Sequence, residues 1–203
     1  MIADLVLLAA DKTIETGVTK IFARSQALGC RAFSVRSFVH VARDPGCYRR
    51  APEFLVGLAS QYDQAVVIFD REGSGTTKSR LEIETEVEDR LSACGWNDRA
   101  ACVVVDPEIE NWVWTDSPHV ATCLSWNLET DLREWLAEQG FWPAGAAKPP
   151  RPKEALQAVL RVTREPRSSA LYGELAQRVS LARCSDPAFI KLRDLLIRWF
   201  PPA

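Results

Sequence analysis

The stretch Ala65-Val66-Val67-Ile68-Phe69 decides the fold class of this chain. All five residues are apolar, and four of them are β-branched or aromatic, so the stretch predicts a short strand that is buried on both faces. Strands of this kind belong to parallel sheets that helices cover on both sides. The sequence therefore predicts an α/β protein built around this strand.

Similar apolar runs lie before and after this strand, at 5–10, 32–39 and 101–105. Helical patterns separate the runs, at 12 to about 28, roughly 52–61 and 79–93, whereas 43–46 (Arg-Asp-Pro-Gly) is expected to break the chain. This alternation predicts an open, mostly parallel sheet of four or slightly more strands, with helices on both faces and a Rossmann-like arrangement.

No strand is expected beyond Asp106. The remaining apolar patterns predict helices over 108–114, 118–126, 130–139, 152–163, 168–179 and 186–199. A segment rich in Pro and Gly, 140–152, predicts a linker. We therefore expect an α/β domain with a helical extension over residues 1–140 and a basic helical subdomain over 141–203.

The 203 residues carry a formal net charge of −2, and this small number excludes a protein that coats nucleic acid through its global charge. The charge is unevenly distributed. Residues 1–140 hold 14 Lys and Arg against 22 Asp and Glu, whereas residues 141–203 hold 11 against 5. The second part is a candidate phosphate-facing surface, with a solvated helical face as the alternative.

The run from Leu5 to Ala10 is short and follows an acid, so it predicts a strand rather than a signal peptide. No run approaches the roughly 20 apolar residues of a membrane span. The six cysteines form no CxxC motif and only two histidines accompany them, which argues against a zinc cluster. We expect reduced, mostly buried thiols in a cytoplasmic protein without a membrane partner.

Acidic residues follow three of the expected strands, where ligands bind in open α/β sheets. Asp11 and Glu15 follow the first strand, Asp70 and Glu72 the third, and Glu110 lies in the tract after the fourth. Carboxylates that converge on one sheet edge would repel one another without a cation, and their hard oxygen ligands suit Mg²⁺ or Mn²⁺. These five acids are the predicted metal ligands.

A helix cap is the structural alternative for two acids at the strand ends. Asp11 could cap the helix expected from Lys12. Asp106, which precedes a Pro and a Glu, has the pattern of a helix start, so a structural role is favoured for it. Glu110 is preferred over Glu108 as a ligand, because Glu110 lies beside apolar residues and would need a partner if buried.

Two of these tracts resemble the motifs of Toprim domains, the fold of topoisomerases, primases and the overcoming-lysogenisation-defect nucleases: Leu7-Leu8-Ala9-Ala10-Asp11-Lys12-Thr13-Ile14-Glu15 and Val67-Ile68-Phe69-Asp70-Arg71-Glu72. Two later tracts, 107–114 and 148–156, are similar to small Toprim-like proteins encoded beside prokaryotic phage-defence genes. The resemblance covers roughly residues 3–156. It departs from the family at Asp11-Lys12, where Glu-Gly is usual, and at Glu72, where a second Asp is usual.

The resemblance implies a nuclease-like protein, an accessory of a phage-defence system, that acts on phosphodiesters of DNA or RNA with a divalent metal ion. Asp11, Asp70 and Glu72 would act in catalysis, and Lys153 would neutralise the scissile phosphate; a solvated lysine at a helix start is its alternative. The expected nucleic-acid contacts are Arg151, Lys153, Arg167, Ser168 and Ser169. The departures leave open a non-catalytic nucleic-acid-binding or adaptor subunit with a degenerate core, whose partner could be another defence protein.

Overall fold

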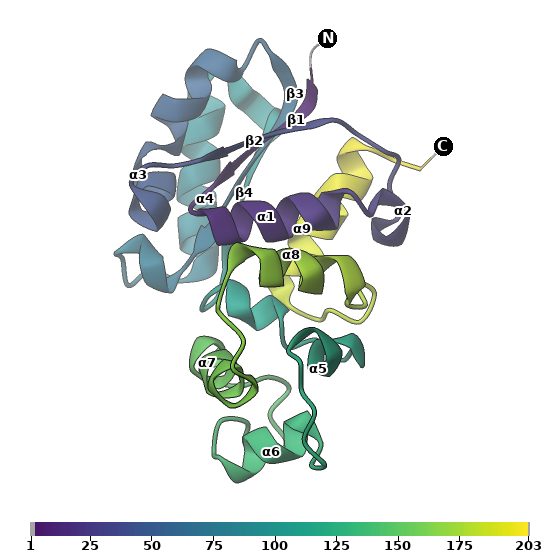
Figure 1. Ribbon diagram of the computed structural model, residues 1–203. Coiled ribbons are helices and arrows are strands. Elements are labelled where there is room, and N and C mark those ends of the chain that lie inside the picture. The colour runs from purple at the N-terminus through teal and green to yellow at the C-terminus, as the bar shows by residue number, and fades with distance from the viewer. Residues whose placement is uncertain (1–2, 203) are drawn as a thin grey trace.

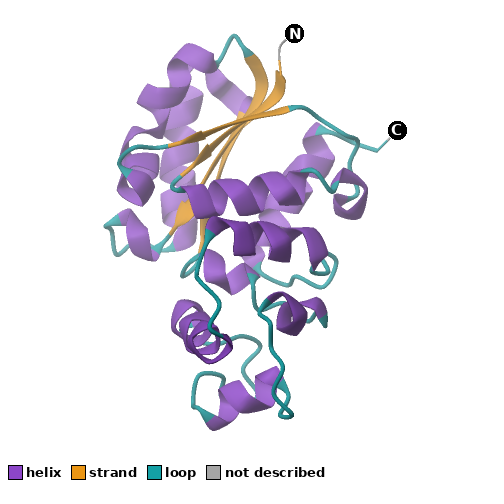
Figure 2. Ribbon diagram, in the orientation of Figure 1, coloured by secondary structure: helices purple, strands orange, loops and turns teal. Residues whose placement is uncertain are grey.

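The computed structural model describes residues 3–202, and a four-stranded parallel sheet lies at its centre (Figures 1 and 2). The strands are β1 (Ala3–Ala9), β2 (Val35–Val39), β3 (Tyr62–Asp70) and β4 (Ala100–Val105). Their order across the sheet is β2-β1-β3-β4, and all three pairings are parallel. The predicted fold class, an open parallel α/β sheet with a helical C-terminal region, is confirmed.

Helices cover both faces of the sheet (Figure 1). On one face, α3 (Arg43–Leu55) packs against β1 and β3, and α4 (Arg80–Leu91) packs against β4. On the other face, α1 (Lys12–Phe22) contacts β1 and β2, while α9 (Pro187–Trp199) contacts β4. Helix α8 (Ser169–Arg178) packs on α1, so the C-terminal helices return to the α/β core. The sheet is buried between these layers, and every residue from Leu5 to Ala9 is inaccessible to solvent.

The remaining elements are short. They comprise α2 (Ser25–Leu28), α5 (His119–Cys123), α6 (Leu132–Glu138) and α7 (Pro152–Thr163). The 3₁₀ turns are η1 (Val56–Leu58), η2 (Glu72–Ser74), η4 (Asn97–Arg99) and η5 (Ile109–Trp112), and η3 (Ser92–Trp96) is a π-helical turn. Helices α5, α6 and α7 lie together at one end of the molecule, below the sheet in Figure 1. None of the helices in residues 3–202 combines the length and the apolar character needed to cross a membrane.

Several predicted helices and breaks differ from the structure. The helix expected over roughly 52–61 is α3, which begins at Arg43 and ends at Leu55 before the turn η1. The expected break at residues 43–46 was wrong, because these residues form the first turn of α3. Pro45 is tolerated there since the first turn needs no N–H donor from it, and Asp44 is favoured by the helix dipole. The helix expected over 12–28 is divided into α1 and α2, and the helix expected over 108–114 is only the 3₁₀ turn η5.

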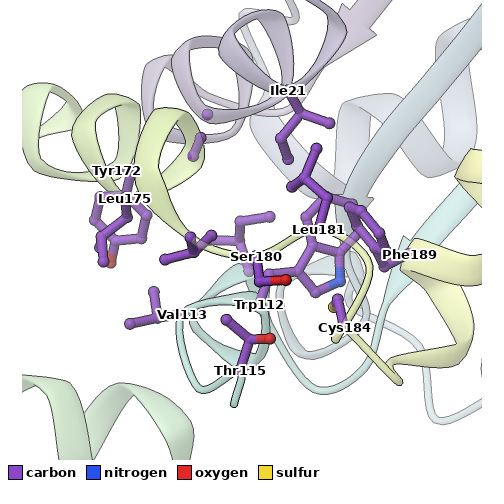
Figure 3. A pocket seen from close by; sticks show the side chains of 14 residues that line it. Ile21, Trp112, Val113, Thr115, Tyr172, Leu175, Ser180, Leu181, Cys184 and Phe189 are labelled. Carbon is purple, nitrogen blue, oxygen red and sulfur yellow. The ribbon is translucent and has the colours of Figure 1, made fainter. Parts of the chain in front are cut away.

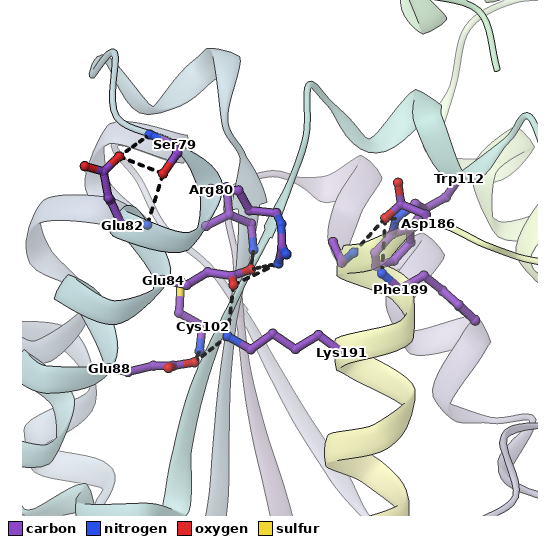
Figure 4. Close-up of polar contacts among 12 residues, drawn as sticks. Ser79, Arg80, Glu82, Glu84, Glu88, Cys102, Trp112, Asp186, Phe189 and Lys191 are labelled. Carbon is purple, nitrogen blue, oxygen red and sulfur yellow. Dashed lines mark hydrogen bonds and ion pairs between the residues drawn. The ribbon is translucent and has the colours of Figure 1, made fainter. Parts of the chain in front are cut away.

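The outer edge of β4 is closed by acidic side chains of α4 (Figure 4). Glu84 accepts a hydrogen bond from the backbone N–H of Val104 at 3.0 Å, and Glu88 accepts one from that of Cys102 at 2.9 Å. The ammonium group of Lys191 in α9 donates to both carboxylates, at 3.1 and 2.7 Å. One guanidinium nitrogen of Arg80, Nη1, donates to both carboxylate oxygens of Glu84 at 2.8 Å. Side chains therefore satisfy the N–H groups to which a fifth strand would bind.

An apolar cavity lies between α1, η5, α8 and the segment that leads to α9 (Figure 3). Its lining includes Ile21, Trp112, Leu175, Leu181 and Phe189, and no lining residue is charged. The lining is therefore mainly apolar and offers no charged group to a ligand. The six cysteines are free, and all except the half-buried Cys94 are buried, as the sequence predicts for structural thiols.

Candidate acidic site at the carboxyl ends of the strands

Asp70, the last residue of β3, is the centre of an acidic cluster. One of its carboxylate oxygens, Oδ1, is buried and has no hydrogen-bond partner in residues 3–202. Burial raises the pKa of Asp70 well above its usual value, and the charges of four other acids raise it further: Asp44, Glu110, Asp11 and Glu108. The structure therefore brings five carboxylates to the carboxyl edge of the sheet.

Asp44 belongs to this cluster although it was absent from the predicted site. It lies in the first turn of α3, and its Oδ1 accepts a hydrogen bond from the backbone N–H of Asp70 at 2.9 Å. Its other oxygen packs on Gly73, where a Cβ atom would lie 2.4 Å from Oδ2. Burial raises the pKa of Asp44, and the charge of Asp11 adds to this shift. Asp44 follows β2, so the rule that selected the other acids would have found it without the expected break.

Asp11 is a helix cap, and it also lies electrostatically close to the acidic cluster. Its side chain accepts a hydrogen bond from the N–H of Ile14 at 2.9 Å and caps α1, which begins at Lys12 as expected. Its charge also raises the pKa of both Asp44 and Asp70. Capping therefore holds the Asp11 carboxylate in place beside the cluster.

Glu15 and Glu72 lie differently from the acids around Asp70. Glu15 accepts a hydrogen bond from the hydroxyl of Ser37 at 2.7 Å and pairs with Lys12, so its carboxylate already has partners. Glu72 begins η2 and is exposed; its backbone N–H donates to the carbonyl of Pro107 at 3.2 Å. Its charge contributes to the raised pKa of Glu108, so Glu72 lies at the rim of the cluster.

Glu110 in η5 is fully buried and has partners from the α8 region. Its Oε1 accepts hydrogen bonds from the guanidinium of Arg167 and the hydroxyl of Tyr172, both at 2.5 Å. The second oxygen, Oε2, is buried without a partner in the described residues. Burial and the charge of Glu110 raise the pKa of Tyr172, which keeps the hydroxyl protonated as a donor. The expectation that a buried Glu110 needs a partner is confirmed.

Glu108 joins α7 to the cluster. One oxygen accepts a hydrogen bond from the backbone N–H of Lys153 at 3.2 Å, and the other accepts one from the Lys153 ammonium at 2.9 Å. Burial raises the pKa of Glu108, and the hydrogen bond to Glu108 raises that of Lys153. Lys153 thus lies among the acids, where the resemblance placed it, but it is bound to Glu108.

The other basic and hydroxyl candidates lie further out. Ser168 caps α8 through a 3.3 Å bond from the N–H of Leu171, and Ser169 is the first residue of that helix, as expected. Arg151 is exposed and pairs with Glu154 at 3.2 Å.

The helix-start interpretation of Asp106 was wrong. The helical turn begins at Ile109, and Asp106 pairs instead with Arg71 at 2.6 Å.

The cluster differs from a preformed metal centre. Within residues 3–202, no three His, Cys, Asp or Glu side chains are arranged so that they surround one ion. Four buried side-chain oxygens in this part of the chain lack hydrogen-bond partners, and two of them belong to Asp70 and Glu110.

Comparisons of the chain with family models, curated proteins and solved structures found no match.

Proposed function

We propose that this protein binds a divalent ion, Mg²⁺ or Mn²⁺, between Asp70, Asp44, Asp11 and Glu110, and uses it to hydrolyse phosphodiesters of DNA or RNA. One observation carries the proposal: buried oxygens of Asp70 and Glu110 lack hydrogen-bond partners inside a group of converging carboxylates. Buried polar atoms are nearly always satisfied in folded proteins, so such oxygens call for a ligand.

The chemistry of the donors favours a hard divalent cation. The groups whose charges raise the pKa of Asp70 are all carboxylates, and oxygen donors of this kind suit Mg²⁺ and Mn²⁺ rather than softer metals. Burial is the main cause of the raised pKa of Asp70 and Asp44, and a cation there would offset the repulsion that adds to it. Asp44 and Asp70 are already positioned by the hydrogen bond between them, and Asp11 by its cap on α1.

The resemblance of residues 3–156 to Toprim proteins supports a phosphodiester as the substrate class. When bound, the metal ion would activate a water molecule and stabilise charge on the reacting oxygens. The chain itself contributes two cations beside the acids, Lys153 and Arg167, which can attract an anionic backbone. The six free thiols and the resemblance support a cytoplasmic accessory of a phage-defence system.

The full chain should be tested with Mn²⁺ or Mg²⁺ on plasmid DNA, single-stranded DNA and RNA, with metal binding measured by calorimetry. We expect cleavage that requires the metal and that falls by at least about 100-fold in Asp70→Asn. Asp63→Asn is the matched control, because Asp63 lies exposed near the other end of β3. Activity that survives Asp70→Asn would contradict the site assignment.

A second candidate function is a non-catalytic nucleic-acid-binding or adaptor subunit. This function is favoured by two ion pairs, because Lys153 and Arg167 are already paired with Glu108 and Glu110. A protein that binds nucleic acid or a defence partner with unchanged affinity in a chelator, and that takes up no Mn²⁺, would have this function instead.

A further inference from the structure

We infer that this chain forms a symmetric dimer through β2, which pairs in antiparallel orientation with β2 of a second copy and joins two four-stranded sheets into one of eight strands. The inference does not rest on the proposed function. Strand β2 is the outermost strand on its side of the sheet (Figure 1). Within residues 3–202, no side chain is bonded to its outward backbone groups, in contrast to β4.

The backbone of β2 alternates between its neighbour β1 and the open side of the sheet. The N–H of His40 donates to β1 at 2.9 Å, and the carbonyl of Ser34 accepts a bond from β1 at 3.0 Å, so even-numbered residues face β1. The odd-numbered residues of the strand therefore direct their N–H and C=O groups outward. An antiparallel strand placed there would complete about six hydrogen bonds.

The length of β2 selects one register for the second copy. Ser37 is the central residue of the strand, so a two-fold axis beside Ser37 pairs all five residues. Val35 then lies opposite Val39 of the second copy, and Arg36 lies opposite its Phe38. A shifted register would leave residues at both ends unpaired, so we expect the pairing centred on Ser37.

In this register the side chains of β2 are complementary to themselves. The guanidinium of Arg36 lies 5.8 Å from the centroid of the Phe38 ring in the same chain, and that ring contacts Phe54 of α3 edge to face at 5.5 Å. In the dimer, the Arg36 of the other copy would lie beside each Phe38 ring as a second cation.

No two like charges lie directly opposite each other in this pairing. The two Arg36 side chains are diagonal neighbours across the axis, which is the longer of the cross-strand distances. A strand that is complementary to itself favours a second copy of this chain over an unrelated peptide.

Large apolar side chains are exposed around the same edge. Val39 is 38% exposed, Phe54 is 37% exposed, and Val41, two residues beyond the strand, is 98% exposed. Apolar residues beside an open strand edge promote association. Pairing centred on Ser37 would cover Val39 with Val35 of the second copy and would bring Val41 beside its Phe33.

A groove beside β2 offers space for the second copy. It is lined in part by Arg36, Phe38, Leu58 and Tyr62, and it lies on the side of the sheet where Phe38 contacts α3. Because Phe38 of the second copy lies opposite Arg36, its ring would enter this groove. The dimer contact would therefore include side chains as well as backbone hydrogen bonds.

The charges on the other side of the sheet are already paired. The hydroxyl of Ser37 donates to Glu15 of α1 at 2.7 Å, and Glu15 pairs with Lys12. The axis would thus bring two ion pairs together rather than two unpaired carboxylates. Because the two strands run in opposite directions, the acidic clusters would lie at opposite ends of the joined sheet, and each would remain within one chain.

Sedimentation equilibrium on the full chain tests the inference. We expect a mass of twice 22.7 kDa at a protein concentration of about 100 μM. Val39→Pro removes one outward N–H and leaves the bonds to β1 in place, so it should weaken the dimer at least about tenfold. Val39→Thr keeps this N–H and the β-branched shape, and it should change the affinity less than about threefold.

Two results of this experiment would overturn the inference. One is a parent protein that remains monomeric at about 200 μM, since an interface of ordinary size associates at lower concentrations. The other is an equal dimer affinity for Val39→Pro and Val39→Thr, because association would then occur elsewhere. Circular dichroism spectra verify that both variants are folded.

Arg36→Glu tests the same surface without a change in the backbone. The side chain is exposed, so the substitution should leave the fold intact, but each Phe38 ring would lose both of its cations. We expect the dimer to weaken at least about fivefold. Arg161→Glu makes the same charge change on the exposed side of α7 and should alter the affinity less than about twofold. Equal effects would overturn the inference.

Ser37→Cys reports the register. At the axis the two Cα atoms would lie about 5.5 Å apart, within the range of a disulfide, so mild oxidation should yield a covalent dimer on a non-reducing gel. In the control Val35→Cys, the two thiols would be separated by about 13 Å along the strands, which is too far for a disulfide. Equal cross-linking of both variants would overturn the inference.

Discussion

The carboxylate of Asp44 accepts a hydrogen bond from the backbone N–H of Asp70 at 2.9 Å, so that the start of α3 is fastened to the end of β3. This contact places two acids side by side although they are 26 residues apart in the chain. The backbone of Gly73 packs directly against the Asp44 carboxylate, so Gly73 is also part of the site.

Gly73→Ala should destabilise the protein through Asp44. The added Cβ would lie 2.4 Å from Oδ2 and 2.5 Å from Cγ, so the carboxylate must move and its bond to Asp70 must break. We expect a loss of about 1–3 kcal/mol in the free energy of unfolding, measured by urea denaturation, and weaker Mn²⁺ binding. Gly57→Ala is the control, because nothing lies within 4 Å of its Cβ position. Equal effects of the two substitutions would contradict this account.

Asp70→Asn should stabilise the metal-free protein at neutral pH. The raised pKa means that the folded state retains a proton that the unfolded state releases, so stability is greatest below the usual carboxyl pKa and is lost as the pH rises through the raised value. Removing the charge should therefore raise the free energy of unfolding at pH 7.

Thermal denaturation between pH 4 and 8 checks this prediction. The parent should lose stability with rising pH more steeply than Asp70→Asn, and Mn²⁺ should raise the melting temperature of the parent but not that of Asp70→Asn. Asp63→Asn, at the exposed end of the same strand, should retain the parent's pH dependence and its response to Mn²⁺. A less stable Asp70→Asn at pH 7 would show that burial and the neighbouring charges do not destabilise the Asp70 carboxylate.

Glu84→Ala should destabilise the sheet at its β4 edge. The substitution would leave the N–H of Val104 without its acceptor and would remove the buried partner of Arg80 and Lys191. The two cations are partly exposed, so we expect a loss of about 2–3 kcal/mol in chemical denaturation rather than the cost of two fully buried charges. Asp89→Ala, an exposed site on the same helix, should change stability by no more than about 0.5 kcal/mol.

Gly17→Ala should stabilise the protein, whereas Gly173→Ala should not. Both glycines lie at the contact between α1 and α8. A Cβ at Gly17 would meet Tyr172 at 4.0 Å, beside the apolar cavity, while a Cβ at Gly173 would meet Thr16 at 3.1 Å. The helix gains about 0.5–1 kcal/mol from Ala over Gly, and the tight contact offsets this gain at Gly173. Melting temperatures of the two variants, compared with the parent, provide the measurement.

The central strands could be predicted because their residues are apolar on both faces, as in the run from Ala65 to Phe69. The start of α3 could not, since Asp-Pro-Gly is equally compatible with a turn and with the first turn of a helix. Local pattern cannot choose between the two, and the choice depends on whether the following helix can pack on the sheet. Because residues 43–46 were interpreted as a break, Asp44 was not recognised as an acid at the edge of the sheet.

The partners of the acids were beyond sequence reasoning for a different reason. Apolar neighbours indicated that Glu110 would need a partner, but Arg167 and Tyr172 lie 57 and 62 residues away in the chain. Glu108 and Lys153 are 45 residues apart. These contacts arise from the way in which α7 and α8 fold back onto the turn after β4, and periodicity within one segment contains no information about that packing.

The carboxylates of Glu84 and Glu88 also determine at which edge the sheet could take up a further strand. Because they occupy the N–H groups of Cys102 and Val104, an additional strand is disfavoured beside β4 and would join beside β2, at the opposite edge. Ser34 and His40 flank β2 and bond to β1, so by alternation the N–H groups of Val35, Ser37 and Val39 point outward. A further strand can therefore pair with the sheet at the β2 edge, whereas the β4 edge is blocked by side chains of α4.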